Sequence, residues 1–77
     1  MDPAAQPAIS IVIPLFNEAE NLADLHCQLT AALDATGRSY ELILVDDGST
    51  DGTREALIAL EARDPRVQAV LLRRNFG

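Results

Sequence analysis

The sequence of 77 residues contains no lysine, one cysteine and one histidine. Its six basic residues are all arginines, and twelve acidic residues leave a formal net charge of −6. An acidic chain lacks the basic surface that contacts to a phosphate backbone require, so we expect no nucleic-acid partner. Cys27 is the only cysteine, so an internal disulfide is excluded. His26 is the only histidine, and the two residues together do not have the spacing of a metal-binding motif.

Targeting and phosphate-binding signatures are missing as well. No apolar run approaches the roughly 18 residues of a spanning helix, and residues 1–8 lack the charged and apolar regions of a signal peptide. We therefore expect a cytoplasmic chain with a flexible leader over residues 1–8. Neither G-x-x-x-x-G-K-[ST] nor a glycine-rich turn after the first strand is present. Phosphates would have to be bound another way, for instance through a metal ion held by carboxylates.

Short apolar segments alternate with segments of helical periodicity. Residues 9–15, 40–45 and 67–72 are apolar and rich in branched side chains, which is typical of buried parallel strands. Pro14 cannot donate a ladder hydrogen bond and is expected to end the first strand. The order strand-helix-strand-helix-strand predicts parallel strands with right-handed crossovers. The fold class is therefore α/β, a β-α-β-α-β half of a doubly wound, mostly parallel Rossmann-like sheet that stops where a second half would begin.

Two helices are expected between these strands. The first has one apolar stripe of leucines three and four residues apart, and Gly37 closes it. At its start, Asn17 and Glu20 have the spacing of a capping box. The second helix covers residues 51–63 with a cap from Ser49 or Thr50. The leucines expected to face inward are Leu22, Leu25, Leu29, Leu33, Leu57 and Leu60.

Polar and aromatic residues follow the first two strands at the edge where open parallel sheets bind ligands. Phe16 and Glu18 come after the first strand, and Asp46 and Asp47 after the second. A ring can stack on a base, and carboxylates accept hydrogen bonds from base N–H groups and ribose hydroxyls. Phe16 could instead pack in the core, and Glu18 could serve only the helix dipole. Two adjacent carboxylates on a buried strand repel each other, which favours a functional role for that pair.

Three segments together resemble a known family. Residues 9–18 (ISIVIPLFNE), 44–53 (LVDDGSTDGT) and 74–77 (RNFG) are similar to the start of family 2 glycosyltransferases with the GT-A fold. The similarity is greatest to the branch that acts on polyprenyl phosphates such as dolichol or undecaprenyl phosphate. It covers residues 9–77, which would form the N-terminal nucleotide-binding portion of a glycosyltransferase domain.

The resemblance implies roles for particular residues. Pro14, Phe16 and Glu18 would line the nucleotide pocket, with Phe16 against the base and Glu18 on the ribose. From the second strand, Val45 and Asp47 would contact the base, and Asp46 would support them. Arg74 would lie near the phosphates.

The resemblance also implies the chemistry of a complete enzyme. Such enzymes transfer the sugar of a UDP- or GDP-linked donor with inversion, here to a lipid phosphate, in some parents at the inner face of a membrane. Their Mg²⁺ or Mn²⁺ is held by an Asp-x-Asp motif after a fourth strand. Neither that motif nor a catalytic residue is expected within these 77 residues, so the chain alone should be inactive.

Two alternatives remain open from the sequence. Residues 42–47 (LILVDD) resemble the acidic Mg²⁺ pocket of a receiver domain, although that pocket follows a first strand and needs a lysine. The chain could also be a non-catalytic fragment that binds nucleotide or merely folds. In the family sheet the first strand is internal, so its absent neighbour would leave an apolar edge exposed. We therefore expect self-association or marginal stability.

Overall fold

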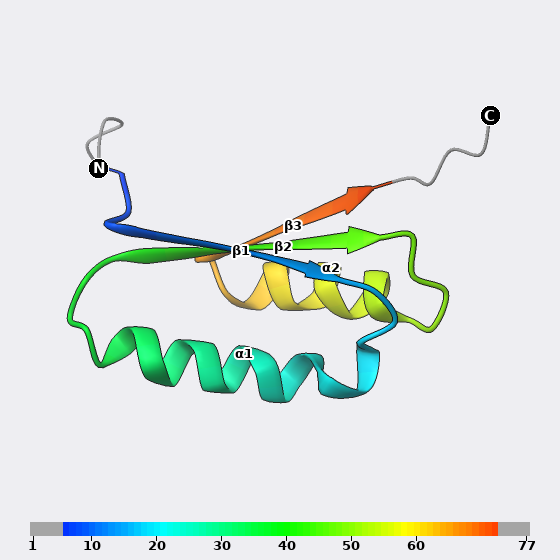
Figure 1. Ribbon diagram of the computed structural model, residues 1–77, viewed down its shortest axis with the longest axis horizontal. Helices are drawn as coiled ribbons and strands as arrows, with labels where there is room; N and C mark the ends of the chain where they lie inside the picture. Colours follow the sequence, from blue (N-terminus) through cyan, green and yellow to red (C-terminus); the bar gives the residue numbers. More distant parts are fainter. Residues whose placement is uncertain (1–5, 73–77) are drawn as a thin grey trace.

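The computed structural model describes residues 6–72, which form one parallel sheet and two helices. The strands are β1 (Ile9–Leu15), β2 (Tyr40–Asp47) and β3 (Val67–Leu72), paired in the order β1-β2-β3. The helices are α1 (Ala19–Asp34) and α2 (Thr53–Arg63). All three strands point the same way, so their carboxyl ends share one edge of the sheet (Figure 1). The predicted β-α-β-α-β order is confirmed. The first strand runs one residue past Pro14, and β2 is two residues longer than expected.

Both helices lie on one face of the sheet, which leaves the other face uncovered by helices (Figure 1). Two right-handed crossovers that step in the same direction place their helices on the same side. Burial alternates along β2 for this reason: Leu42 and Leu44, on the helix side, are fully buried, while Ile43 and Val45, on the other side, are half-buried. We call the uncovered side the open face. Val12 of β1, which alternates with the helix-facing residues, is 62% exposed.

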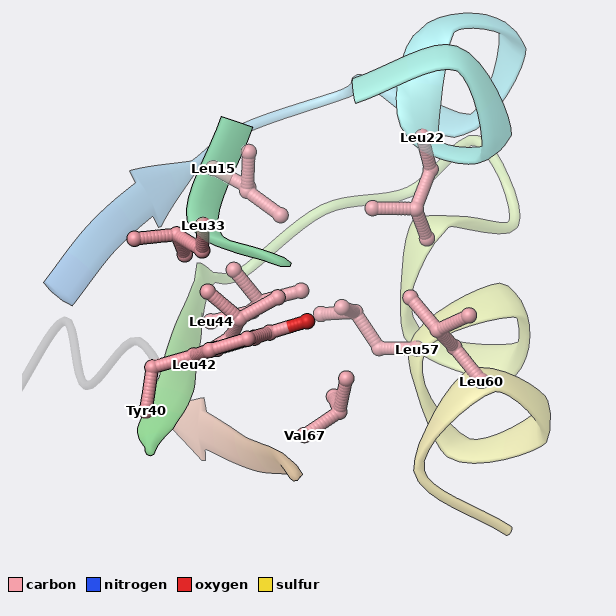
Figure 2. Packing of buried hydrophobic residues seen from close by; sticks show 9 residues of the cluster. All are labelled: Leu15, Leu22, Leu33, Tyr40, Leu42, Leu44, Leu57, Leu60 and Val67. Carbon is pink, nitrogen blue, oxygen red and sulfur yellow. The ribbon is translucent and has the colours of Figure 1, made fainter. Parts of the chain in front are cut away.

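The core lies between the sheet and the two helices (Figure 2). The expected leucine stripe faces it: Leu22 and Leu33 of α1 are buried, and Leu57 and Leu60 of α2 are 0% and 4% exposed. Leu25 and Leu29 are partly buried and pack against this cluster. Among the described residues, neither helix is long and apolar enough to cross a membrane.

The predicted helix caps are wrong. α1 begins after Glu18 and α2 after Gly52, and neither residue gives a side-chain cap hydrogen bond. Gly52 has φ of 96°, in the left-handed region that favours glycine. Asn17 also has a positive φ of 52°, and its side chain is used elsewhere. α1 ends at Asp34 with Ala35 as its C-cap, so Gly37 does not cap the helix directly. With φ of 69° it lies two residues further on, in the turn where its N–H donates to the Asp34 carbonyl.

A polar cluster fixes the amino ends of β2 and β3. The Arg66 guanidinium donates hydrogen bonds to Asp64 at 3.1 and 3.3 Å and to Asp34 at 3.0 Å, and it lies 4.6 Å from the centre of the Tyr40 ring. His26 Nε2 is 2.8 Å from Asp64 Oδ2. Burial alone raises the pKa of Asp64, but hydrogen bonds from Arg66 and His26 outweigh it and hold that pKa well below its usual range.

The outer edge of β3 is occupied by hydrogen bonds from its own surroundings. In a parallel ladder, alternate residues turn both backbone groups to the same side. Leu42 N–H donates to the Arg66 carbonyl, so Val67 and Ala69 face outward. The Val67 N–H donates to the Asp64 carbonyl at 3.0 Å, and the Ala69 N–H donates to the Glu61 carboxylate at 2.8 Å. On this edge the N–H groups of Val67 and Ala69 are therefore already bonded by the turn after α2 and by α2 itself.

The predicted leader, residues 1–8, lies mostly outside the described residues. At its end, the Ala8 N–H donates to both the carbonyl and the hydroxyl of Ser39, at 3.1 and 3.0 Å. The chain is therefore attached to the start of β2 one residue before β1 begins. The flexibility assigned to the leader stays a prediction.

Candidate functional site

Two loops meet at the carboxyl edge of the sheet: the first loop, residues 16–18 after β1, and the second loop, residues 48–52 after β2. They are neighbours because β1 and β2 pair along their whole length. The Asn17 N–H donates to Ser49 Oγ at 2.8 Å, and the Thr50 N–H donates to Asn17 Oδ1 at 2.9 Å. Asparagine tolerates the left-handed conformation that Asn17 adopts. Asn17 therefore joins the two loops and does not cap α1.

The start of α1 is held by side chains from the start of α2. The Glu18 N–H donates to Thr53 Oγ1 at 2.9 Å, and the Ala19 N–H donates to Asp51 Oδ2 at 3.3 Å. The Thr53 hydroxyl, which is buried, also donates to Asp51 Oδ1. The first N–H groups of a helix need acceptors from outside the helix, and here they come from a segment more than thirty residues away. The hydrogen bond from Thr53 lowers the pKa of Asp51.

Asp46 and Asp47 point to opposite faces of the sheet, because successive side chains of a strand alternate. Asp46 is 0% exposed on the helix side. Its carboxylate accepts hydrogen bonds from the N–H groups of Gly48 and Ser49, each at 3.2 Å, and from Arg54 Nη1 at 2.9 Å. The premise that the two carboxylates repel each other side by side is therefore wrong. For Asp46 the structure supplies an internal role, which is to shape the second loop.

The charge of Asp46 is stabilised despite its burial. Burial by itself raises the pKa of this carboxyl, but hydrogen bonds from Ser49 and the positive charge of Arg54 outweigh that effect. The pKa of Asp46 is therefore lowered, and the group is ionised at neutral pH. The ion pair with Arg54 is buried on the carboxylate side only, since the Arg54 side chain is 33% exposed.

The other predicted residues gather on the open face and in the first loop. Pro14 is the ladder partner of Val45, and both face away from the helices. Asp47 is two residues after Val45, on the same face, and is exposed. Phe16 is 49% exposed and Glu18 half-buried in the first loop. Arg74 lies outside the described residues, and its placement near phosphates stays a prediction.

This arrangement can bind a planar, uncharged group bearing N–H donors. Pro14 and Val45 offer an apolar surface, with the Asp47 carboxylate beside it as an acceptor. Within residues 6–72, no group of three or more His, Cys, Asp or Glu side chains is placed to hold a metal ion. The residues described do not fit the Mg²⁺ or Mn²⁺ that the family resemblance implies. The receiver-like alternative is disfavoured, because the Asp46 carboxylate is fully buried and bonded to Gly48, Ser49 and Arg54, and the chain has no lysine.

A groove of about 210 Å³ lies between the two helices, apart from these residues. It is lined by small and apolar side chains and a single arginine. The residues concerned are Ala19, Leu22, Ala23, Ala56, Ala59, Leu60 and Arg63. It contains none of the predicted ligand contacts, which lie on the open face and in the first loop.

Sequence reasoning missed the residues that support the site. Ser49 and Thr53 accept hydrogen bonds from the first loop, Asp51 accepts one from Ala19 at the start of α1, and Arg54 acts through Asp46. One signal was available for the first three, because Ser, Thr and Asp side chains in loops commonly bond to backbone groups. Arg54 gave no such signal, since its partner is eight residues earlier and on another element.

Comparison with known proteins extends the geometric argument. Two curated relatives are undecaprenyl-phosphate 4-deoxy-4-formamido-L-arabinose transferases. The one from Salmonella paratyphi A is 39% identical over 77 residues, which is 99% of this chain and 24% of the relative. The one from Edwardsiella ictaluri is 47% identical over 70 residues, 90% of this chain and 22% of the relative. The chain thus spans about a quarter of the length of the curated relatives it matches.

The fold also matches a solved enzyme. A mannosyltransferase from Pyrobaculum calidifontis, in complex with GDP-Man and Mn²⁺, superposes with a TM-score of 0.69 at 25% identity, over 99% of this chain and 22% of that one. The fold is therefore the start of a GT-A, Rossmann-like sheet, as expected. The family model described as Glycosyl transferase family 2 matches residues 10–77. Motifs, fold and family match agree, and the chain belongs to glycosyltransferase family 2.

Proposed function

We propose that this chain provides the nucleoside-binding part of a glycosyltransferase that uses a UDP- or GDP-linked sugar. The observation that carries the proposal is the grouping of Pro14, Val45 and Asp47 on the open face at the carboxyl ends of β1 and β2. Ligands of open parallel sheets bind at that edge. The GDP-Man in the solved mannosyltransferase of the same fold supports a nucleotide-sugar donor.

Each contact has a physical reason. Phe16 is half-exposed and stacks on the base, while Pro14 and Val45 form the apolar surface beneath it. The Asp47 carboxylate accepts a hydrogen bond from a ring N–H, which uracil and guanine both carry, so Asp47 alone does not choose between them. Glu18 accepts hydrogen bonds from the ribose hydroxyls. Charge-assisted hydrogen bonds of this kind are roughly twice as strong as neutral ones.

The transfer step belongs to the complete enzyme. A phosphate oxygen of the acceptor attacks the anomeric carbon, the bond to the nucleoside diphosphate breaks, and the configuration inverts. The undecaprenyl-phosphate transferases among the relatives support a lipid-phosphate acceptor and a location at the inner face of a membrane. A phosphate acceptor is already ionised and needs little help from a general base. We assign no catalytic group and no metal ligand among the described residues.

An NMR titration of the 77-residue chain with UDP and with GDP, each with and without Mg²⁺, tests the proposal. We expect amide shifts concentrated at residues 14–18 and 45–49, and the tighter nucleotide identifies the base. Replacing Asp47 with alanine should weaken binding by about tenfold or more, the effect of losing one hydrogen bond to a charged group. Asp24→Ala, on the exposed side of α1, is the matched control and should bind as the wild type does.

Two outcomes would contradict the proposal. One is a folded chain whose amides at these two segments do not respond to either nucleotide. The other is a response that persists unchanged in Asp47→Ala. The first outcome would favour the remaining alternative, a fragment that folds without binding nucleotide.

A further inference from the structure

A single nitrogen of Arg54 bridges the ends of two strands. Arg54 lies in the first turn of α2, and its Nη1 donates to Asp46 Oδ2 at 2.9 Å and to the Leu72 carbonyl at 3.1 Å. Asp46 is near the end of β2, and Leu72 is the last residue of β3. Neither hydrogen bond involves a residue proposed to contact the nucleoside. Arg54 therefore acts on the site through the backbone that carries it.

The Leu72 carbonyl needs this donor because the β2–β3 ladder stops there. Alternation along the ladder turns the Leu72 backbone toward β2, where the next donor in register is the Gly48 N–H. That N–H turns back onto Asp46 Oδ2 instead, at 3.2 Å. Arg54 Nη1 supplies the missing donor. The guanidinium thus replaces one rung of the sheet at the point where β2 leaves it.

The same guanidinium stabilises the charge that shapes the second loop. The Asp46 carboxylate is fully buried, and its other donors are the N–H groups of Gly48 and Ser49. A buried carboxylate that loses its cation must either become protonated or reorganise. Asp47 is the next residue in the chain after Asp46. A change in the Asp46 pocket on the helix side is therefore expected to reach the carboxylate on the open face through one peptide unit.

We propose that Arg54 is a positioning residue for the nucleoside site, holding the ends of β2 and β3 in register so that Asp47 faces the base. The inference rests on the proposed function. The structure thus assigns a specific task to a residue with no ligand contact of its own.

The test compares Arg54→Met, which keeps the apolar stem, with Arg54→Lys, which restores a charged donor. We expect Arg54→Met to weaken UDP or GDP binding by about fivefold to tenfold, less than the direct loss of a hydrogen bond to a charged group, because Arg54 acts on the site only through the backbone. Arg54→Lys should recover most of that loss. Arg63→Met, an exposed arginine in the last turn of the same helix, is the matched control and should bind as the wild type does.

A second readout follows the Asp46 carboxyl by ¹³C NMR during an acid titration. Its pKa should rise in Arg54→Met and return toward the wild-type value in Arg54→Lys, with the Gly48 and Ser49 amides shifting in parallel. If Arg54→Met fails to give a dispersed spectrum, Arg54→Gln, which retains an N–H₂ donor without the charge, replaces it in both measurements.

The outcomes separate this inference from the proposed function. A wild-type chain that binds neither nucleotide refutes the proposed function itself. Wild-type binding that survives unchanged in the neutral variant, with the Asp46 pKa raised, refutes only the role of Arg54, because the ion pair then affects the fold without affecting the site. Weaker binding in the neutral variant together with rescue by lysine supports it.

Discussion

Replacing Thr53 with valine isolates the hydrogen bonds that join the first loop to α2. The two side chains have nearly the same shape, so the core around this fully buried position is preserved. What is lost is the hydroxyl, which accepts from the Glu18 N–H at 2.9 Å and donates to Asp51. The perturbation therefore removes a junction between two segments 35 residues apart without opening a cavity.

The expected cost follows from what each partner can do afterwards. The Glu18 N–H is partly buried and loses its acceptor, which costs about 1–2 kcal/mol of the free energy of unfolding. The exposed Asp51 carboxylate exchanges the hydroxyl for water and adds little. A change of 1 kcal/mol shifts the melting temperature of a domain of this size by about 4–8 °C. We therefore expect Thr53→Val to melt roughly 5–15 °C below the wild type.

Thermal unfolding followed by circular dichroism measures this difference. Thr50→Val, on an exposed residue of the second loop, should change the melting temperature by no more than a few degrees. The reasoning is refuted if Thr53→Val melts no lower than Thr50→Val.

Three further predictions concern the core, the polar cluster and the open edge. Leu57→Ala, at a fully buried position, should reduce the free energy of unfolding in urea by about 2–5 kcal/mol. Ile58→Ala, at a residue 51% exposed, should stay within about 0.5 kcal/mol of the wild type. Equal effects of the two substitutions would contradict the packing described. Folding lowers the pKa of Asp64, so the ionised carboxylate stabilises the folded chain. This contribution to the free energy of unfolding is complete above the pKa of the unfolded chain, about 4, and is lost as the pH falls toward the lower pKa of the folded chain. In urea unfolding measured at a series of pH values, the free energy of unfolding of Asp64→Asn should therefore fall less steeply below about pH 4 than that of the wild type. An equally steep fall would argue against the polar cluster. Val12→Lys should reduce concentration-dependent association in sedimentation velocity, and a wild-type chain that is monomeric at every concentration would remove the basis for that expectation.

The elements of the fold were predictable because their signals are local. Runs such as residues 67–72 and the leucines of α1 encode burial by their spacing alone, and the observed strands and buried faces agree with them. The helix starts were not predictable in this way. Asn17 and Glu20 have the spacing of a capping box, yet the Asn17 side chain bonds to Thr50, which only the β1–β2 pairing brings near. A tertiary partner displaced a local one.

The sequence could predict where the candidate site lies, but not which residues hold its loops in place. The topology alone places Pro14 and Asp47 at the carboxyl edge, and the alternation of a strand would have separated Asp46 from Asp47 had it been applied. The donors to Asp46 could not be inferred, because Arg54 reaches it from another element.

The bonded N–H groups at the outer edge of β3 bear on how copies of this chain could assemble. A sheet with two free edges can add neighbours on both sides and grow without end, as in fibrils. Here the N–H groups of Val67 and Ala69 are already bonded to Asp64 and Glu61, so a strand added at β3 would find two of its donors in use. Two copies that meet through β1 would leave a β3 edge on each flank. We therefore expect edge pairing through β1 to favour a pair with two-fold symmetry over a polymer.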